Sequence, residues 1–169
     1  MTPATVIFSH GQESGPWGGK IQAMAQLAKG LGCNVESIDY QGIAHATERV
    51  EKLVAACSSV KGPIILIGSS MGGHVATAAA KSTGAIGVFV LAPAYYMPGY
   101  EDLTPPPPEV PLQIIHGWQD DVVPAENSIR FARDCHATLH LIDGDHRLTD
   151  NIDEINYYLE RFIGNLTQD

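Results

Sequence analysis

The sequence predicts an α/β fold, a three-layer sandwich in which helices cover both faces of a mostly parallel, six-stranded sheet. Short β-type runs alternate with segments of helical periodicity along almost the whole chain. The run Ile64–Ile67 is continuously apolar, which is typical of a strand covered on both faces. No repeat or linker divides the 169 residues, so we expect a single domain, residues 1–169.

Four strands and three helices are expected in the first half of the chain. The expected strands cover residues 6–8, 35–40, 63–68 and 85–91. One face of the first expected helix holds four apolar residues, Ile21, Met24, Ala28 and Leu31. Gly30 and Gly32 mark the end of this helix, and residues 47–60 and 71–81 form the next two.

A segment without regular periodicity, residues 93–110, interrupts the alternation. It contains four consecutive prolines at 105–108, which cannot lie inside a helix, so we expect a stiff polyproline connector there. The remaining expected elements are strands at 112–116 and 139–142 and helices at 125–134 and 151–163. Gly164 stands where the cap of the last helix is expected.

Composition excludes several classes of protein. The formal net charge of −9, from 10 basic and 19 acidic residues, argues against a nucleic-acid partner. Three scattered cysteines favour a reducing compartment over a disulfide scaffold. No apolar run approaches the ~20 residues of a membrane span, and no basic start leads into one. We therefore expect a cytoplasmic protein with no membrane partner.

The third expected strand ends in Gly68–Gly72, which reads G-S-S-M-G, and a helix begins at once. A G-x-S-x-G turn between strand and helix is the pattern of a nucleophile elbow, where glycines allow the chain to turn tightly around an exposed serine. We expect Ser70 to be the nucleophile. The backbone N–H of Met71 is the expected oxyanion donor, since it lies at the helix N-terminus.

A serine nucleophile requires a base and an acid, and in this fold class their order along the chain is Ser, Asp or Glu, His. The fifth expected strand runs into Asp120 and Asp121, and the sixth runs into His146. His146 is the expected base. The residues alone leave the acid open between Asp120 and Asp121, with Asp145 as a weaker third candidate.

The loop after the first strand is expected to supply the second oxyanion donor, the backbone N–H of Gln12, with Glu13 as the alternative. His10 and His116 each precede a glycine at a strand end, where hydrogen bonds to loop backbone are expected, and His74 is expected on a helix surface. Four aromatic residues are candidates to line the site or to pack as ordinary core, namely Trp17, Tyr95, Tyr96 and Trp118.

No cofactor is expected and no metal site is expected. His136 and His140 are four residues apart, but they span the entry to a strand and do not share one helix face. The glycine-rich segment from Gly11 to Lys20 is a weak candidate for a phosphate loop. Only three residues separate Gly15 from Gly19 where such a loop needs four, and Ile21 replaces the magnesium-binding Ser or Thr.

The sequence resembles the α/β-hydrolase superfamily, and within it the small, lidless bacterial-type esterases. Five segments carry the resemblance: F-S-H-G-Q-E-S-G-P-W from Phe8, I-D-Y from Ile38, G-S-S-M-G-G from Gly68, H-G-W-Q-D-D-V-V-P from His116 and G-D-H from Gly144. The resemblance implies a minimal hydrolase fold without a cap domain. It also implies that Asp120 is the acid, because the family pattern H-G-x-x-D-x-x-V-P places the acid at its aspartate.

The function implied is serine-dependent acyl transfer on a small-molecule ester or thioester, with a lactone or activated carbon–carbon bond left open. Ser70 attacks the carbonyl, His146 takes the proton and Asp120 stabilises the imidazolium. A short connector in place of a cap predicts an open site for small esters. The alternative is a weakly catalytic or non-catalytic interaction protein of the same fold, since fold does not determine function. The oligomeric state is left open.

Overall fold

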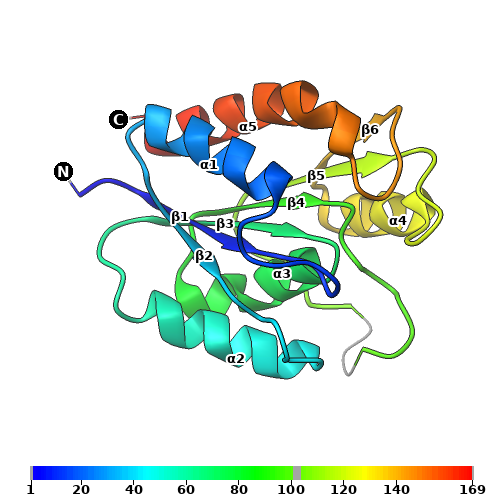
Figure 1. The fold of residues 1–169 in the computed structure, drawn as a ribbon, viewed down its shortest axis with the longest axis horizontal. Coiled ribbons are helices and arrows are strands. Elements are labelled where there is room, and N and C mark those ends of the chain that lie inside the picture. The colour runs from blue at the N-terminus through cyan, green and yellow to red at the C-terminus, as the bar shows by residue number, and fades with distance from the viewer. Residues whose placement is uncertain (1, 101–103, 169) are drawn as a thin grey trace.

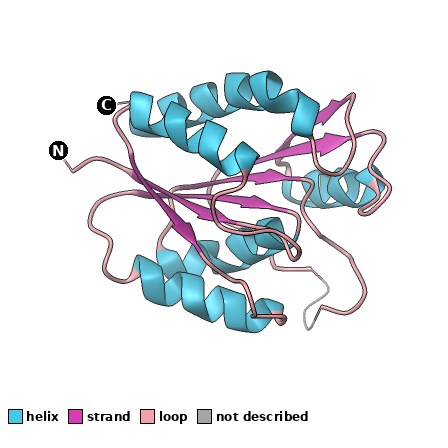
Figure 2. Ribbon diagram, in the orientation of Figure 1, coloured by secondary structure: helices cyan, strands magenta, loops and turns pink. Residues whose placement is uncertain are grey.

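Six parallel strands form a twisted sheet at the centre of the molecule (Figure 2). The computed structural model describes residues 2–100 and 104–168. The strands are β1 (Thr5–Ser9), β2 (Asn34–Ile38), β3 (Ile64–Ser69), β4 (Gly87–Leu91), β5 (Leu112–Gly117) and β6 (Thr138–Ile142). Their order across the sheet is β2-β1-β3-β4-β5-β6, and each neighbouring pair is parallel. The predicted fold class is confirmed.

Helices cover both faces of this sheet (Figure 1). Helices α1 (Gly19–Gly30) and α5 (Ile152–Thr167) lie side by side on one face. Helices α2 (Ala46–Cys57), α3 (Met71–Thr83) and α4 (Ala125–Cys135) cover the other, and a 3₁₀ turn, η1 (Thr149–Asn151), leads into α5. None of the helices in the described ranges combines the length and the apolar character that crossing a bilayer requires.

Two cores result because successive side chains of a strand point to opposite faces. In β1, Val6 and Phe8 join the core beneath α1 and α5, whereas Ile7 joins the core beneath the other three helices. All residues of β1 and β4 are buried, while the edge strands β2 and β6 are partly exposed. The apolar run Ile64–Ile67 is buried throughout because β3 lies in the middle of the sheet.

One expectation about a helix end and one about an apolar helix face are wrong. Helix α5 continues through Gly164 to Thr167, so Gly164 is an interior residue and not a cap. Leu166 packs against the core and lies directly over Gly87, which has no side chain to obstruct it, and this contact favours the extra turn. Leu31, expected on the apolar face of the first helix, is 39% exposed because α1 ends one residue earlier.

The connection between β4 and β5 is short, and the part of it that the structure describes contains no cap domain. Its described residues, 92–100 and 104–111, form bends and turns but neither helix nor strand, and residues 105–108 have no regular secondary structure. Residues 101–103 of the predicted connector lie outside the described residues. Because all the strands are parallel, their carboxyl ends meet at one edge, and the loops that follow β1, β3, β5 and β6 gather there.

Candidate active site

Ser70 stands alone between β3 and α3 in a strained backbone conformation. Its φ of 55° and ψ of −119° lie outside the regions that residues with a side chain ordinarily adopt. Gly72 makes this turn possible, because a Cβ there would collide with the carbonyl groups of Ser9 and His10. A Cβ at Gly68 would likewise collide with the backbone of Gly72. The two glycines of the G-x-S-x-G pattern therefore serve the close packing that the motif predicts.

Three loops bring Ser70, His146 and Asp120 into a hydrogen-bonded line. Nε2 of His146 lies 3.1 Å from Oγ of Ser70, and Nδ1 of His146 lies 2.8 Å from Oδ2 of Asp120. The carboxylate can only accept, so Nδ1 carries the proton and Nε2 presents its lone pair to the serine hydroxyl. This arrangement is the one a serine nucleophile requires of its base and acid.

The carboxylate of Asp120 is buried and fully hydrogen-bonded. Its side chain has no exposed surface, Oδ1 accepts from the backbone N–H groups of Val122 and Val123 at 2.8 Å each, and Oδ2 accepts from His116 as well as His146. Burial by itself would raise the pKa of Asp120. The hydrogen bonds from His116, His146 and the two N–H groups outweigh burial and hold this pKa well below its usual range.

The structure separates the three carboxylates that the residues alone left open, of which the family resemblance favoured Asp120. Asp121 is exposed. Asp145 accepts hydrogen bonds from the backbone N–H groups of Arg147 and Leu148 in its own loop. Asp120 is the one carboxylate of the described residues that hydrogen-bonds His146.

His116 has a second contact that sequence reasoning missed. As expected it binds loop backbone, with Nε2 2.9 Å from the carbonyl oxygen of Val123. The same nitrogen lies 3.0 Å from Oδ2 of Asp120, and Nδ1 lies 2.6 Å from the hydroxyl of Ser128 on α4. Nε2 therefore donates, and the carboxylate lies between two histidines. The signal in the sequence that could have indicated this contact is the spacing of four residues between His116 and Asp120.

The two predicted oxyanion donors are backbone N–H groups in the loop after β1 and at the start of α3. Within the described ranges, neither Gln12 nor Met71 donates its backbone N–H to another group of the chain. Gly11, next to Gln12, packs against the nucleophile: a Cβ at Gly11 would lie 3.5 Å from the Cβ of Ser70. The loop after β1 therefore borders the serine, as the prediction of Gln12 requires.

Two of the four candidate aromatic residues belong elsewhere. Tyr95 is completely buried, stacks on Phe131 at 4.0 Å and hydrogen-bonds Thr77, so it is part of the core beneath α4. The guanidinium carbon of Arg130 lies over the ring of Tyr96, 4.0 Å from the ring centre.

Trp17 and Trp118 remain, at 45% and 56% exposed, in the loops after β1 and β5 at the same edge of the sheet as Ser70. His74, expected on a helix surface, is 2% exposed because α3 is the helix packed most deeply between sheet and loops.

Lys20 lies beside the nucleophile loop, with Nζ 3.5 Å from Oγ of Ser69. Burial lowers the pKa of Lys20 to about 8, and the neighbouring charge of Arg147 acts in the same direction while Asp145 and Asp120 oppose it. Among the described residues no group of three His, Cys, Asp or Glu side chains is placed to hold a metal ion.

Comparison with known proteins places the chain in a family. A family model described as the alpha/beta hydrolase family matches residues 6–159. This chain belongs to the alpha/beta hydrolase family. A search among curated proteins finds no match.

Solved structures of alpha/beta hydrolases superpose closely on the whole chain. A putative hydrolase of the alpha/beta superfamily from Xanthomonas campestris pv. campestris is 26% identical, with a TM-score of 0.87 over 97% of this chain and 99% of that one. XC6422 from Xanthomonas campestris, described as an a/b serine hydrolase without lid, is 20% identical, with a TM-score of 0.82 over 96% and 82%.

Est1E from Butyrivibrio proteoclasticus, of which one structure holds ferulic acid, is 17% identical, with a TM-score of 0.80 over 97% and 88% of the two chains. The family and the first of these structures support a hydrolase activity. The lidless neighbour agrees with the short connection between β4 and β5.

Proposed function

We propose that this alpha/beta hydrolase is a serine esterase that cleaves a small carboxylic ester or thioester through an acyl-enzyme. The observation that carries the proposal is the hydrogen-bonded line from Ser70 through His146 to the buried carboxylate of Asp120. Exposed serines at helix N-termini are common. A serine whose hydroxyl lies against an imidazole that is itself oriented by a buried carboxylate has the three groups that nucleophilic catalysis needs.

In the proposed first half-reaction, Oγ of Ser70 bonds to the substrate carbonyl carbon while Nε2 of His146 takes the hydroxyl proton. The carbonyl oxygen becomes an oxyanion and accepts hydrogen bonds from the backbone N–H groups of Met71 and Gln12. The tetrahedral intermediate then collapses, the bond to the leaving group breaks, and His146 gives its proton to the departing alcohol or thiol.

In the second half-reaction water replaces the alcohol. His146 takes a proton from water as its oxygen attacks the acyl carbon, and the second tetrahedral intermediate releases the acid and returns the proton to Ser70. Asp120 stabilises the imidazolium in both halves. Its low pKa supports this role, since it keeps the carboxylate charged whenever His146 gains a proton.

The open mouth of the site supports a small substrate. His146 retains 18% side-chain exposure, and the connection between β4 and β5 adds no cap. Trp17 and Trp118 offer apolar surface at the edge of the sheet where the site lies. Short acyl groups, which need little enclosure, fit this arrangement better than long chains, which need a covered apolar channel.

The test is hydrolysis of p-nitrophenyl acetate and butyrate by the wild type and by two neighbouring serine variants. Ser70→Ala should abolish turnover, whereas Ser69→Ala, one residue away at the end of β3, should retain it. Labelling by a fluorophosphonate probe, which needs an activated serine, should be lost in Ser70→Ala alone. A folded wild type that neither hydrolyses these esters nor takes the probe would instead support the binding role as an interaction member of the fold.

A further inference from the structure

Arg49 of helix α2 is a buried cation that has no carboxylate partner among the residues the structure describes. It is 2% exposed, and no Asp or Glu of the described residues forms an ion pair with it. A guanidinium removed from water loses hydration that only good hydrogen bonds can replace. The groups that accept hydrogen bonds from Arg49 therefore indicate its role.

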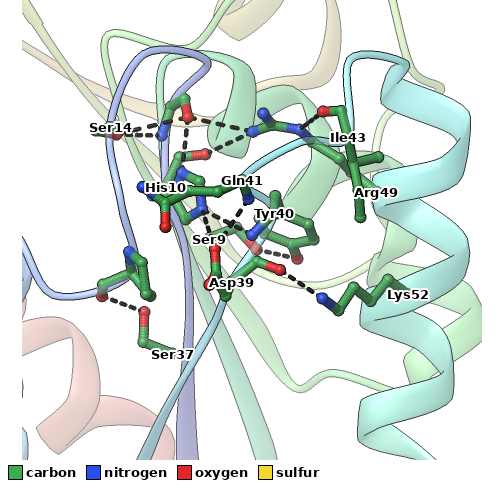
Figure 3. A network of polar contacts seen from close by, with 12 residues as sticks. Ser9, His10, Ser14, Ser37, Asp39, Tyr40, Gln41, Ile43, Arg49 and Lys52 are labelled. Atoms are coloured by element: carbon green, nitrogen blue, oxygen red, sulfur yellow. Dashed lines mark hydrogen bonds and ion pairs between the residues drawn. The ribbon is translucent and has the colours of Figure 1, made fainter.

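Backbone carbonyls take the hydrogen bonds that Arg49 donates. Nε donates to the carbonyl of Ile43 at 2.8 Å, and Nη1 donates to the carbonyls of His10 at 3.3 Å and Gly11 at 3.2 Å. The guanidinium carbon lies 5.2 Å from the ring centre of Tyr40. Figure 3 shows Arg49 reaching from its helix to the loop that carries His10 and Ser14. The side chain thus joins α2 to the loop after β1.

The Gly11 carbonyl is also held from a second side. Nε2 of His10 lies 2.8 Å from the backbone nitrogen of Tyr40 and accepts a hydrogen bond from its N–H, so the ring proton of neutral His10 is on Nδ1. Nδ1 lies 2.7 Å from the same Gly11 oxygen and donates to it. Burial lowers the pKa of His10, which favours this neutral form.

The geometry of one peptide group connects these contacts to the chemistry. A trans peptide is planar, so its C=O and N–H point in opposite directions. The peptide between Gly11 and Gln12 is trans, since the described chain has no cis bond. Holding its oxygen toward Arg49 and His10 fixes its N–H in the opposite direction. That N–H belongs to Gln12 and is free of any partner in the described residues.

We propose that Arg49 is a positioning residue of the oxyanion hole, which aims the backbone N–H of Gln12 at the reacting carbonyl oxygen by binding the carbonyl of Gly11. The proposal rests on the proposed esterase function. A cation on the carbonyl side of a peptide also polarises its N–H, so the same contact strengthens the donor. Arg49 is 38 residues from Gly11 in sequence, and no motif marks it.

The experiment compares Arg49→Met and Arg49→Lys with the wild type, and uses Lys52→Met as the matched control. Lys52 is an exposed cation on the same helix and donates to the carbonyl of Asp39, outside the loop. Each variant is titrated with a fluorophosphonate so that kcat refers to folded, competent sites. The kcat and KM for p-nitrophenyl butyrate are measured, together with the inhibition constant of a trifluoromethyl ketone, whose adduct carries an oxyanion.

A group that acts only on the oxyanion affects the transition state and not substrate binding. Arg49→Met should therefore lower kcat by about 10²-fold with little change in KM, as expected for a misplaced oxyanion donor. Affinity for the trifluoromethyl ketone should fall in parallel. Arg49→Lys, which keeps the charge but cannot reach all three carbonyls, should fall between, and Lys52→Met should match the wild type.

A guanidinium supplement distinguishes positioning from a purely structural role. Millimolar guanidinium should raise the kcat of Arg49→Ala, and methylammonium at the same ionic strength should not. Wild-type kcat per titrated site in Arg49→Met, or a loss confined to KM, would overturn the proposal. If Arg49→Met does not fold, Arg49→Lys decides in the same way, and wild-type kcat in that variant overturns it.

Failure of the underlying function has a different signature. A wild type without Ser70-dependent hydrolysis and without probe labelling overturns both the esterase proposal and the role of Arg49. An active wild type with unaffected Arg49 variants overturns only the latter.

Discussion

Nδ1 of His146 lies 2.8 Å from Oδ2 of Asp120, and the Asp120 side chain has no surface exposed to water. A hydrogen bond to a buried, charged acceptor is stronger than one between neutral groups, so it holds the imidazole in one tautomer and one orientation. His116 donates to the same oxygen at 3.0 Å. The relationship makes the two neighbouring aspartates of this loop sharply unequal.

Replacing Asp120 by Asn should therefore lower kcat for p-nitrophenyl butyrate by about 10⁴-fold, because an amide stabilises neither the required tautomer nor the imidazolium. Asp121→Asn removes the same charge one residue away, at an exposed position, and should leave kcat close to the wild type. Steady-state kinetics of the two variants decide the question. If Asp121→Asn lowers kcat more than Asp120→Asn does, the assignment of Asp120 as the acid is wrong.

The pKa of Asp120 predicts a specific dependence of stability on pH. In the folded protein the pKa of Asp120 is below its ordinary value of 3.8, so the carboxyl binds its proton less readily there than in the unfolded chain. The stability it contributes is full above about pH 4 and is lost as pH falls toward the folded pKa. Urea unfolding of the wild type and Asp120→Asn should thus differ at pH 7 and converge toward pH 2. A difference that stays constant over this range would contradict the low pKa.

Lys20 predicts a dependence of stability on pH at the alkaline end of the scale. Burial lowers its pKa to about 8 from 10.5, so the folded protein releases this proton before the unfolded chain does. The unfolded state binds more protons between these values, and stability due to Lys20 rises with pH from about 8 to 10.5.

Lys20→Met should remove this rise and stabilise the protein at pH 7, where the wild type holds a partly buried charge. Lys29→Met, an exposed change on the same helix, is the control. Thermal unfolding at pH 7, 8 and 10 measures both, and parallel curves for wild type and Lys20→Met would show that the amine is not desolvated.

Two glycines give opposite predictions for the same substitution. Gly72→Ala places a Cβ against the carbonyls of Ser9 and His10, and these are backbone atoms that cannot move aside as a flexible side chain could. We expect a loss of several kcal/mol in the free energy of unfolding, about 3 or more, from strain of this kind.

Gly164→Ala lies inside α5 with no atom near the new Cβ, and should stabilise by about 1 kcal/mol because alanine is the better helix former. Chemical denaturation measures both. Equal effects of the two substitutions would mean that the packing at the elbow is looser than the structure shows.

Much of the fold follows from local signals. Strand and helix periodicity predicted all six strands and five helices to within a few residues, and the all-parallel order agrees with their alternation. The helix end predicted at Gly164 was wrong because Leu166, which lies beyond the glycine, packs against the core and the helix continues to Thr167. Tyr95 was a candidate for the site, but a tyrosine with a partner for its hydroxyl can be buried as core.

The sequence by itself determined the α/β class, the position of the tight turn around Ser70, and the order in which a serine, an aspartate and a histidine reach the ends of their strands. These are matters of periodicity and turn chemistry, which act over a few residues. The residues alone left Asp120 and Asp121 open, the family resemblance favoured Asp120, and the tertiary structure brings Asp120 against His146. Only the tertiary structure shows that His116 shares that carboxylate and that Arg49 holds the carbonyl of Gly11. The reason is that each of these depends on how loops from separate elements converge on one edge of the sheet, where a hydrogen bond is made or lost over about an ångström.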